Sequence, residues 1–168
     1  MVTHSINSVF QGWLRTGLLS MLLAVAGIGN AWAIAGVDFS SYELQDAQDA
    51  IDAGDFDEAI TMLEEIISFE PEDADALNLL GFSLRSSDRN DEAMEKYNEA
   101  LAIDPDHQGA LEYQGELFLK LGDQASAEAN LEKLVGLCPD GCEAHATLQT
   151  AIEKFKDGTE VSWVKPTN

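Results

Sequence analysis

Residues 74–107 read ADALNLLGFSLRSSDRNDEAMEKYNEALAIDPDH. In the first half, the apolar residues Leu77, Leu80 and Leu84 recur at helical spacing, and in the second half Ala93 and Tyr97 continue such a pattern. Residues 87–90, SDRN, separate the two patterns. The stretch therefore predicts two antiparallel helices joined by a short turn.

Gly81 lies inside the first helical pattern. A glycine there costs about 1 kcal/mol relative to alanine, so it needs a packing reason. With the small residues Ala93 and Ala100 in the second half, it predicts a close contact between two helix backbones. Pro105 ends the unit, because proline biases the residue before it, Asp104, towards an extended conformation.

The same pattern occurs on both sides of this stretch. Three prolines stand 34 residues apart, and an alanine precedes each by twelve residues. These residues are Pro71, Pro105 and Pro139, with Ala59, Ala93 and Ala127. The period predicts three copies of one helix–turn–helix unit.

A 34-residue period with these residue types resembles the tetratricopeptide repeat (TPR) family. The middle unit matches at Leu77, Leu80, Gly81, Leu84, Ala93, Tyr97, Ala100 and Pro105. The third unit departs at Gln114 and Leu134, and the first departs at Asp46 and Ala50. The resemblance implies an all-α, right-handed α-solenoid over residues 40–157. Its three helix pairs would cover about 40–73, 74–107 and 108–141, followed by a capping helix at 142–156 and a tail at 158–168.

Residues 1–33 have the pattern of a secretory signal peptide. They contain one formal charge, Arg15, followed by the apolar run TGLLSMLLAVAGIG and the small residues Ala31 and Ala33. We predict export to the periplasm and a mature chain that begins at Ile34 or Gly36. The alternative is an uncleaved inner-membrane anchor, although glycines and Asn30 interrupt the apolar run before it reaches spanning length.

The chain is strongly acidic, with 31 Asp and Glu against 9 Lys and Arg. Such a charge repels phosphate backbones and anionic lipid head groups, so we expect no nucleic-acid binding and no membrane contact except through an uncleaved leader. The acids cluster at expected helix starts, where they favour the positive end of the helix dipole. The chain lacks the D-x-D-x-D-G spacing of a calcium loop.

Catalytic and phosphate-binding motifs are absent from the sequence, so we predict a protein that is not an enzyme and has no cofactor. The chain has no Gly-rich phosphate loop, no G-x-S-x-G and no H-E-x-x-H. His107 is expected in a turn and His145 on the capping helix, both as solvated residues.

The TPR resemblance implies a partner-binding groove lined by the first helix of each pair. By the family's offsets, its lining includes Gln48, Ile51, Asn78, Phe82, Arg85, Glu112, Glu116 and Leu119. Phe82, Leu119 and Ile51 would bury apolar partner surface, with Arg85 and Asn78 as orienting polar groups. The alternative is that some of these side chains pack between repeats or against the C-terminal tail.

The basic clamp by which some family members hold a carboxylate is missing. Leu44, Leu79, Gly109 and Tyr113 stand at its positions. An acidic-tail ligand is therefore not expected.

Cys138 and Cys142 form a C-x-x-x-C motif that the repeat does not require. In an exported chain they predict a structural disulfide between the third helix pair and the capping helix. The alternative is a redox pair, or a Cu(I) site with His145 as third ligand.

Two functions follow from the sequence. The first is a periplasmic interaction module, a scaffold or assembly factor, that binds a protein partner whose identity the sequence does not specify. The second is a metal-handling or thiol-handling protein that uses the C-x-x-x-C pair.

Overall fold

The computed structural model describes residues 39–159, with side chains from Glu43 onward. The predicted leader and the tail beyond Thr159 lie outside this range. The described residues form seven helices and no strand: α1 (Phe39–Ala53), α2 (Phe56–Phe69), α3 (Ala74–Ser86), α4 (Asn90–Ile103), α5 (Gln108–Lys120), α6 (Gln124–Leu137) and α7 (Glu143–Lys156).

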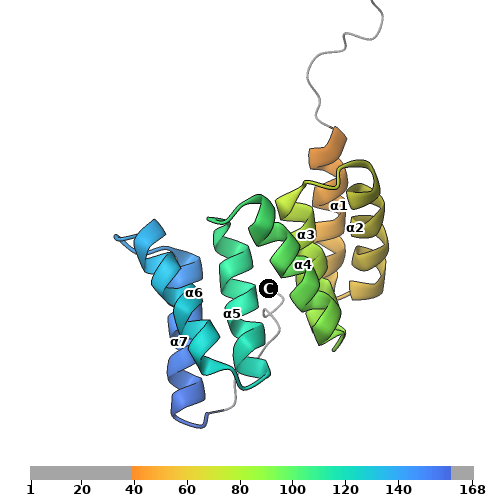
Figure 1. Cartoon of the computed structure of the whole chain (residues 1–168). Helices are drawn as coiled ribbons and strands as arrows, with labels where there is room; N and C mark the ends of the chain where they lie inside the picture. Colours follow the sequence, from red (N-terminus) through yellow and green to blue (C-terminus); the bar gives the residue numbers. More distant parts are fainter. Residues whose placement is uncertain (1–38, 160–168) are drawn as a thin grey trace, which may run out of the picture. The chain divides into compact units, whose positions relative to one another are not determined.

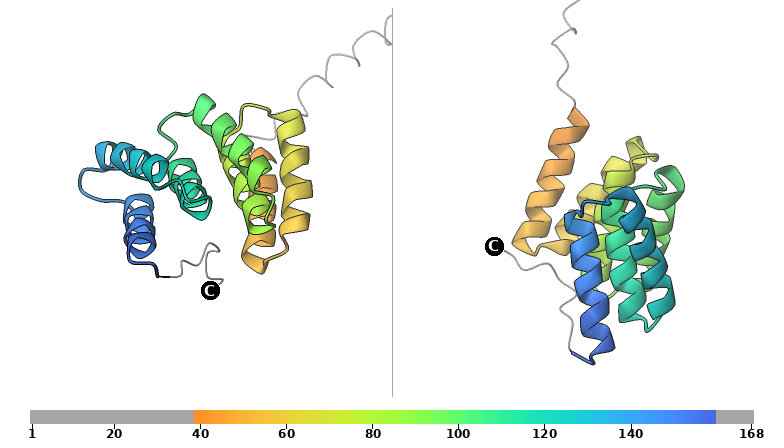
Figure 2. Two further views of the ribbon diagram at one scale, coloured as in Figure 1. Left: turned by 60° about the horizontal axis from the view of Figure 1, so that its bottom comes forward. Right: turned by 90° about the vertical axis from the view of Figure 1, so that its left-hand side faces the viewer.

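The helices stack as pairs along one direction (Figures 1 and 2). Within a pair, α1 packs on α2, α3 on α4 and α5 on α6, and α7 contacts both α5 and α6. The first helices of successive pairs also contact one another, α1 with α3 and α3 with α5, whereas α2 and α4 make no such contact. The first helices therefore lie on the tighter, inner side of the array. This arrangement confirms the predicted all-α solenoid of helix pairs.

Side chains from the preceding turns begin three of the helices. The carboxylates of Asp73 and Asp123 accept hydrogen bonds from the N–H groups of Ala76 and Ser126, at 3.0 and 3.1 Å. These bonds satisfy backbone donors that a helix start leaves unpaired. At α5 the capping residue is His107.

The turn inside each pair has a left-handed residue at the same place. Gly54, Asp88 and Gly122 have φ values of 82°, 61° and 85°. Glycine adopts this conformation without strain, whereas an aspartate tolerates it at some expense. The Asp88 carboxylate accepts a hydrogen bond from Lys120 Nζ at 2.8 Å, so the strained turn also contacts the end of α5.

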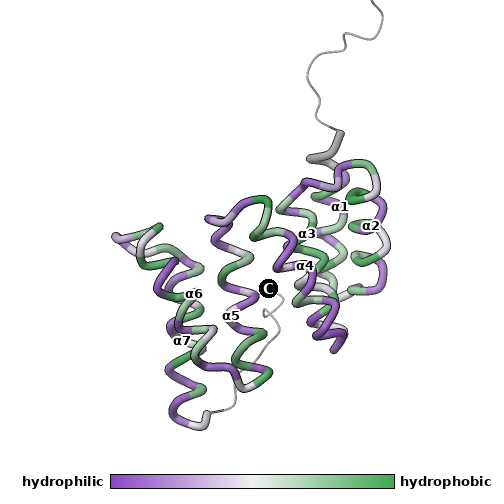
Figure 3. Tube along the Cα trace, viewed as in Figure 1, coloured by the Kyte–Doolittle hydropathy of each residue, from purple (hydrophilic) through white to green (hydrophobic). Residues whose placement is uncertain are grey.

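The apolar core consists of two main clusters. The first lies among α1–α4 with Leu117 of α5, and the second lies among α5–α7. A small third cluster, Leu77, Ala100 and Ala110, lies between them. Figure 3 shows how hydrophobic and hydrophilic residues alternate along each helix, so that each helix buries one face.

Gly81 and Gly115 both lie against large side chains. A Cβ atom at Gly81 would lie 2.6 Å from the Tyr97 ring, and one at Gly115 would lie 2.6 Å from a Leu148 methyl group. The predicted close approach is present, but the prediction of two helix backbones in contact was wrong. Tyr97 is the residue that requires a glycine at position 81, because its ring is fully buried between α3 and α4.

Candidate functional site

An aromatic and charged cluster joins α3 to α5 on the inner side of the array. Arg85 Nη1 donates a hydrogen bond to Glu116 Oε2 at 2.6 Å. The Arg85 guanidinium lies 5.3 Å from the Phe82 ring centre and 5.5 Å from that of Tyr113, within the range of cation–π attraction. The two rings are 5.0 Å apart, centre to centre. We call Phe82, Arg85, Tyr113 and Glu116 the inner cluster.

Arg85 keeps its charge although its side chain is only 1% exposed. Burial alone would lower the pKa of its guanidinium, but Tyr97 and Glu116 raise it, and the balance lies above the ordinary value. Burial, together with the neighbouring Glu112, raises the pKa of Tyr113 to about 12. The inner cluster therefore holds a fixed ion pair between two neutral aromatic rings at physiological pH.

Two polar atoms beside this ion pair have no hydrogen-bond partner among the described residues. They are the Oδ1 acceptor of Asn78 and the Nε–H donor of Arg85, and both are buried. A buried polar atom without a partner costs about 1–3 kcal/mol, so such pairs call for an explanation. Asn78 and Arg85 lie two turns apart on α3, on the side that faces α5.

The structure places the predicted groove residues at different depths. Six are buried: Ile51, Asn78, Phe82, Arg85, Glu116 and Leu119. Gln48 and Glu112 are half-buried, and Gln48 Nε2 donates to Asp52 Oδ1 at 2.9 Å. Phe82 stacks against Phe56 and Tyr113, so this part of the predicted lining packs between repeats. Direct contact of these residues with a partner stays a prediction.

Tyr113 is the member of the inner cluster that the groove prediction omitted. The sequence analysis noted it only as a departure from the basic clamp. Its ring covers Arg85 and Phe82 from α5. The available signal was its position three residues before Glu116 on the same helix, which places both side chains on one face.

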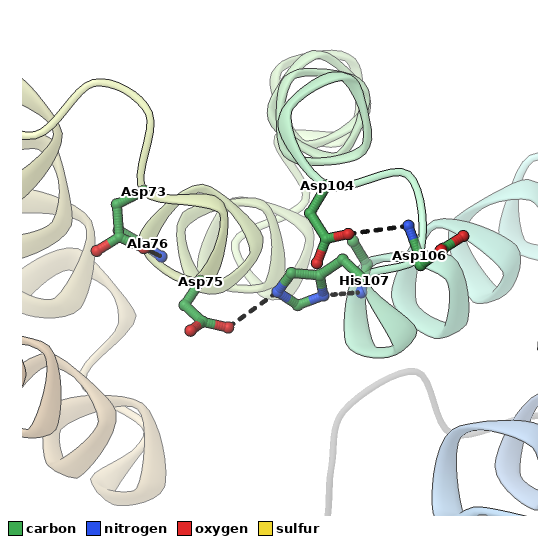
Figure 4. Close-up of polar contacts among 7 residues, drawn as sticks. Asp73, Asp75, Ala76, Asp104, Asp106 and His107 are labelled. Atoms are coloured by element: carbon green, nitrogen blue, oxygen red, sulfur yellow. Dashed lines mark hydrogen bonds and ion pairs between the residues drawn. The ribbon is translucent and has the colours of Figure 1, made fainter. Parts of the chain in front are cut away.

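A second contact between the repeats involves His107 (Figure 4). The Ala110 N–H donates to His107 Nδ1 at 3.0 Å, so the ring proton is on Nε2, which lies 2.9 Å from Asp75 Oδ1. The His107 side chain is only 12% exposed. The expectation of a solvated histidine was wrong here, because one ring both caps α5 and holds α3.

Gln114 joins the third pair to the second by hydrogen bonds. Its Nε2 donates to Asn98 Oδ1 at 2.8 Å, and its Oε1 accepts from Asn130 Nδ2 at 3.0 Å. Asn130 Nδ2 also donates to the Leu111 carbonyl at 3.1 Å. The departure from the TPR pattern at Gln114 therefore places a polar network where leucine would give an apolar contact.

Cys138 and Cys142 are joined by a disulfide, with their Cα atoms 5.8 Å apart. Cys138 follows α6 and Cys142 precedes α7, so the bond closes the connection between these helices. A Cu(I) site requires thiolate ligands, which this bond removes. Among residues 39–159, no group of three or more His, Cys, Asp and Glu residues is close enough to hold a metal ion.

None of the seven described helices is both long and apolar enough to cross a lipid bilayer.

Comparisons with known proteins agree on the architecture. A family model described as "Tetratricopeptide repeat" matches residues 44–108 and 89–141, more than half of the chain. A TPR repeat-containing thioredoxin of Arabidopsis thaliana is 30% identical over 112 residues, which are 62% of this chain and 16% of that protein. The chain thus spans about one sixth of that relative.

Two solved structures have the same fold. The type III secretion translocator chaperone SycD of Yersinia enterocolitica has a TM-score of 0.65 and 19% identity, covering 75% of this chain and 98% of SycD. PcrH, solved in complex with the chaperone binding region of PopD, has a TM-score of 0.63 and 18% identity, covering 74% of this chain and 96% of PcrH.

Proposed function

Because the chain belongs to the tetratricopeptide repeat family, we propose that it is an exported protein-interaction module that holds an extended segment of a partner protein along the inner side of α1, α3 and α5. Proteins of this fold include PcrH, whose structure contains a bound region of another protein. The described residues offer interaction surface, and the inner cluster is the point at which we place recognition.

The observation that carries the proposal is the pair of unpaired polar atoms beside the inner cluster. The Asn78 Oδ1 atom needs a donor and the Arg85 Nε–H group needs an acceptor. They lie on one helix seven residues apart, about 10 Å along its axis. An extended peptide covers that distance in about three residues and carries both a donor and an acceptor on every residue. The site is therefore suited to the main chain of a partner, which gives affinity without a fixed sequence.

Phe82 and Arg85 are unsuitable for the first test, since replacing Arg85 by alanine would leave Glu116 buried without its partner. Asn78→Leu is cleaner, because Asn78 Oδ1 makes no hydrogen bond in the described residues. Asn90→Leu is a matched control, since Asn90 Oδ1 is also buried and unpaired but lies at the start of α4.

The experiment is recovery of the cross-linked partner with the tagged full chain, identification by mass spectrometry, and titration of the purified pair. Loss of one hydrogen bond weakens binding by about 3–10-fold, so Asn78→Leu should raise Kd by that factor while Asn90→Leu leaves it unchanged. Equal Kd values for both variants would place the binding surface elsewhere.

We propose a periplasmic location on the basis of the leader pattern in residues 1–33. The Cys138–Cys142 disulfide supports this, because such bonds persist in oxidising compartments. Intact mass of the periplasmic fraction should begin at Ile34 or Gly36. A chain that retains Met1 in a membrane fraction would contradict the cleavage.

A further inference from the structure

The unpaired atoms on α3 imply that a peptide segment completes the inner side of the array, and the chain itself contains a suitable one. Residues 160–168 read EVSWVKPTN and lie outside the described structure. We propose that this segment docks between α3 and α5 with Trp163 against Tyr113, and occupies the groove until a partner protein displaces it. The displacement rests on the proposed function, whereas the docking does not.

The end of α7 puts the segment within reach of the site. Helices α3, α5 and α7 run in the same direction, and α7 packs beside α5 (Figures 1 and 2). At the end of α7, Gly158 adopts φ 67° and the Thr159 N–H bonds back to the Lys154 carbonyl at 2.9 Å, which ends the helix. Thr159 therefore lies at the end of the array where α3 and α5 also end.

The length of the segment is sufficient. Neighbouring helices pack about 8–10 Å apart, so α3 lies about two helix spacings from α7. Nine extended residues span about 30 Å. Trp163, the fourth residue after Thr159, reaches α5, and the residues beyond it reach α3.

The chemistry of the segment matches the site. The inner side carries Glu112 and Glu116, and the chain as a whole has a formal net charge of −22, so a strongly acidic segment would be repelled. Residues 160–168 carry one acid and one base, Glu160 and Lys165. Tyr113 is half-buried and presents an aromatic surface, to which a tryptophan ring adds apolar contact and an indole N–H donor. The main chain of the segment supplies a donor for Asn78 Oδ1 and an acceptor for Arg85 Nε–H.

Intrinsic fluorescence tests the docking directly. The chain has three tryptophans, and Trp13→Phe with Trp32→Phe leaves Trp163 alone in the full chain. Docking predicts emission that is blue-shifted, and acrylamide quenching that is several-fold weaker, relative to the free peptide EVSWVKPTN. Asn78→Leu should shift both values towards the free peptide, and Asn90→Leu should leave them unchanged. Emission and quenching equal to those of the free peptide, in a chain with normal helical circular dichroism, would overturn the proposal.

Deletion of residues 160–168 tests the displacement. It should increase affinity for the partner several-fold, and the added peptide should compete with the partner for the truncated chain. Unchanged affinity after deletion would overturn the competition. A shielded Trp163 without any groove-bound partner would contradict the proposed function alone, and an exposed Trp163 with a groove-bound partner would contradict the docking alone.

Discussion

The two halves of the array bury their cores in different ways. In the first half, Gly81 of α3 receives the ring of Tyr97 from α4, its own partner helix. In the second half, the equivalent Gly115 of α5 receives Leu148 from α7, the helix after the pair. The difference teaches that α7 is a core element of the third pair as well as its cap, because Leu148 is fully buried.

The boundary between the halves is mainly polar. It holds the Arg85–Glu116 ion pair, the His107–Asp75 contact and the Gln114 network, with one small apolar cluster beside them. Hydrogen bonds and ion pairs need fixed geometry, whereas apolar contacts tolerate sliding. The polar boundary therefore fixes the angle between the halves, at the place where we propose that a peptide binds.

The largest effect is expected from Leu148→Ala. Removing a fully buried leucine side chain costs about 2–5 kcal/mol of unfolding free energy. If the halves have separate cores, native-state hydrogen exchange should accelerate in α5–α7 and much less in α1–α4. Val135→Ala, at a residue 48% exposed, is the control and should change little. Equal acceleration in all seven helices would show a single cooperative core.

Alanine at the two glycines separates the two kinds of packing. The Tyr97 ring is rigid, so Gly81→Ala should destabilise by about 1–3 kcal/mol in urea unfolding. At Gly115 the obstacle is the end of a leucine side chain, which can change rotamer, so Gly115→Ala should be less destabilising. The reverse order would contradict the assignment of Tyr97 and Leu148 to these contacts.

A smaller effect is expected at the polar boundary. Gln114→Leu removes hydrogen bonds to Asn98 and Asn130, and we expect a loss of about 1 kcal/mol because Asn130 keeps its bond to the Leu111 carbonyl. Replacing both buried members of the network, in Gln114→Leu with Asn130→Leu, should recover most of this loss. A double-mutant cycle in urea measures the coupling, and additive losses would show that the two side chains do not act together.

Tyr97 gives the smallest effect at neutral pH and a larger one in alkali. Burial raises its pKa far above the usual value near 10, and the pKa of Tyr113 to about 12. Above pH 10 the unfolded chain releases these protons while the native chain keeps them, so stability falls as pH rises. Tyr97→Phe also removes a buried hydroxyl without a partner and should stabilise by about 1 kcal/mol at pH 7. Urea midpoints at pH 7 and pH 11 should show a shallower alkaline decline in this variant, and identical slopes would contradict the burial of the phenol.

Local patterns made the helix-pair fold predictable. The 34-residue spacing of the prolines identified the helix pairs, because helical periodicity and proline breaks depend on residues close in sequence. The family also constrained Gly81 and Gly115, although it did not identify their neighbours.

The candidate site was less predictable, because its contacts join residues distant in sequence. Arg85 and Glu116 were both named from family offsets, but their pairing depends on how α3 packs on α5. The role of His107 in capping α5 depends on a rare use of the imidazole ring, and Tyr113 was overlooked for its place in the clamp pattern. The export leader stays a prediction.

Hydrogen exchange of the full chain with and without its bound partner tests the central claim most directly. The account predicts slower exchange in α3 and α5 around the inner cluster, with no change in α2 and α4 on the opposite side. Slower exchange confined to α2 and α4, with α3 and α5 unchanged, would contradict it.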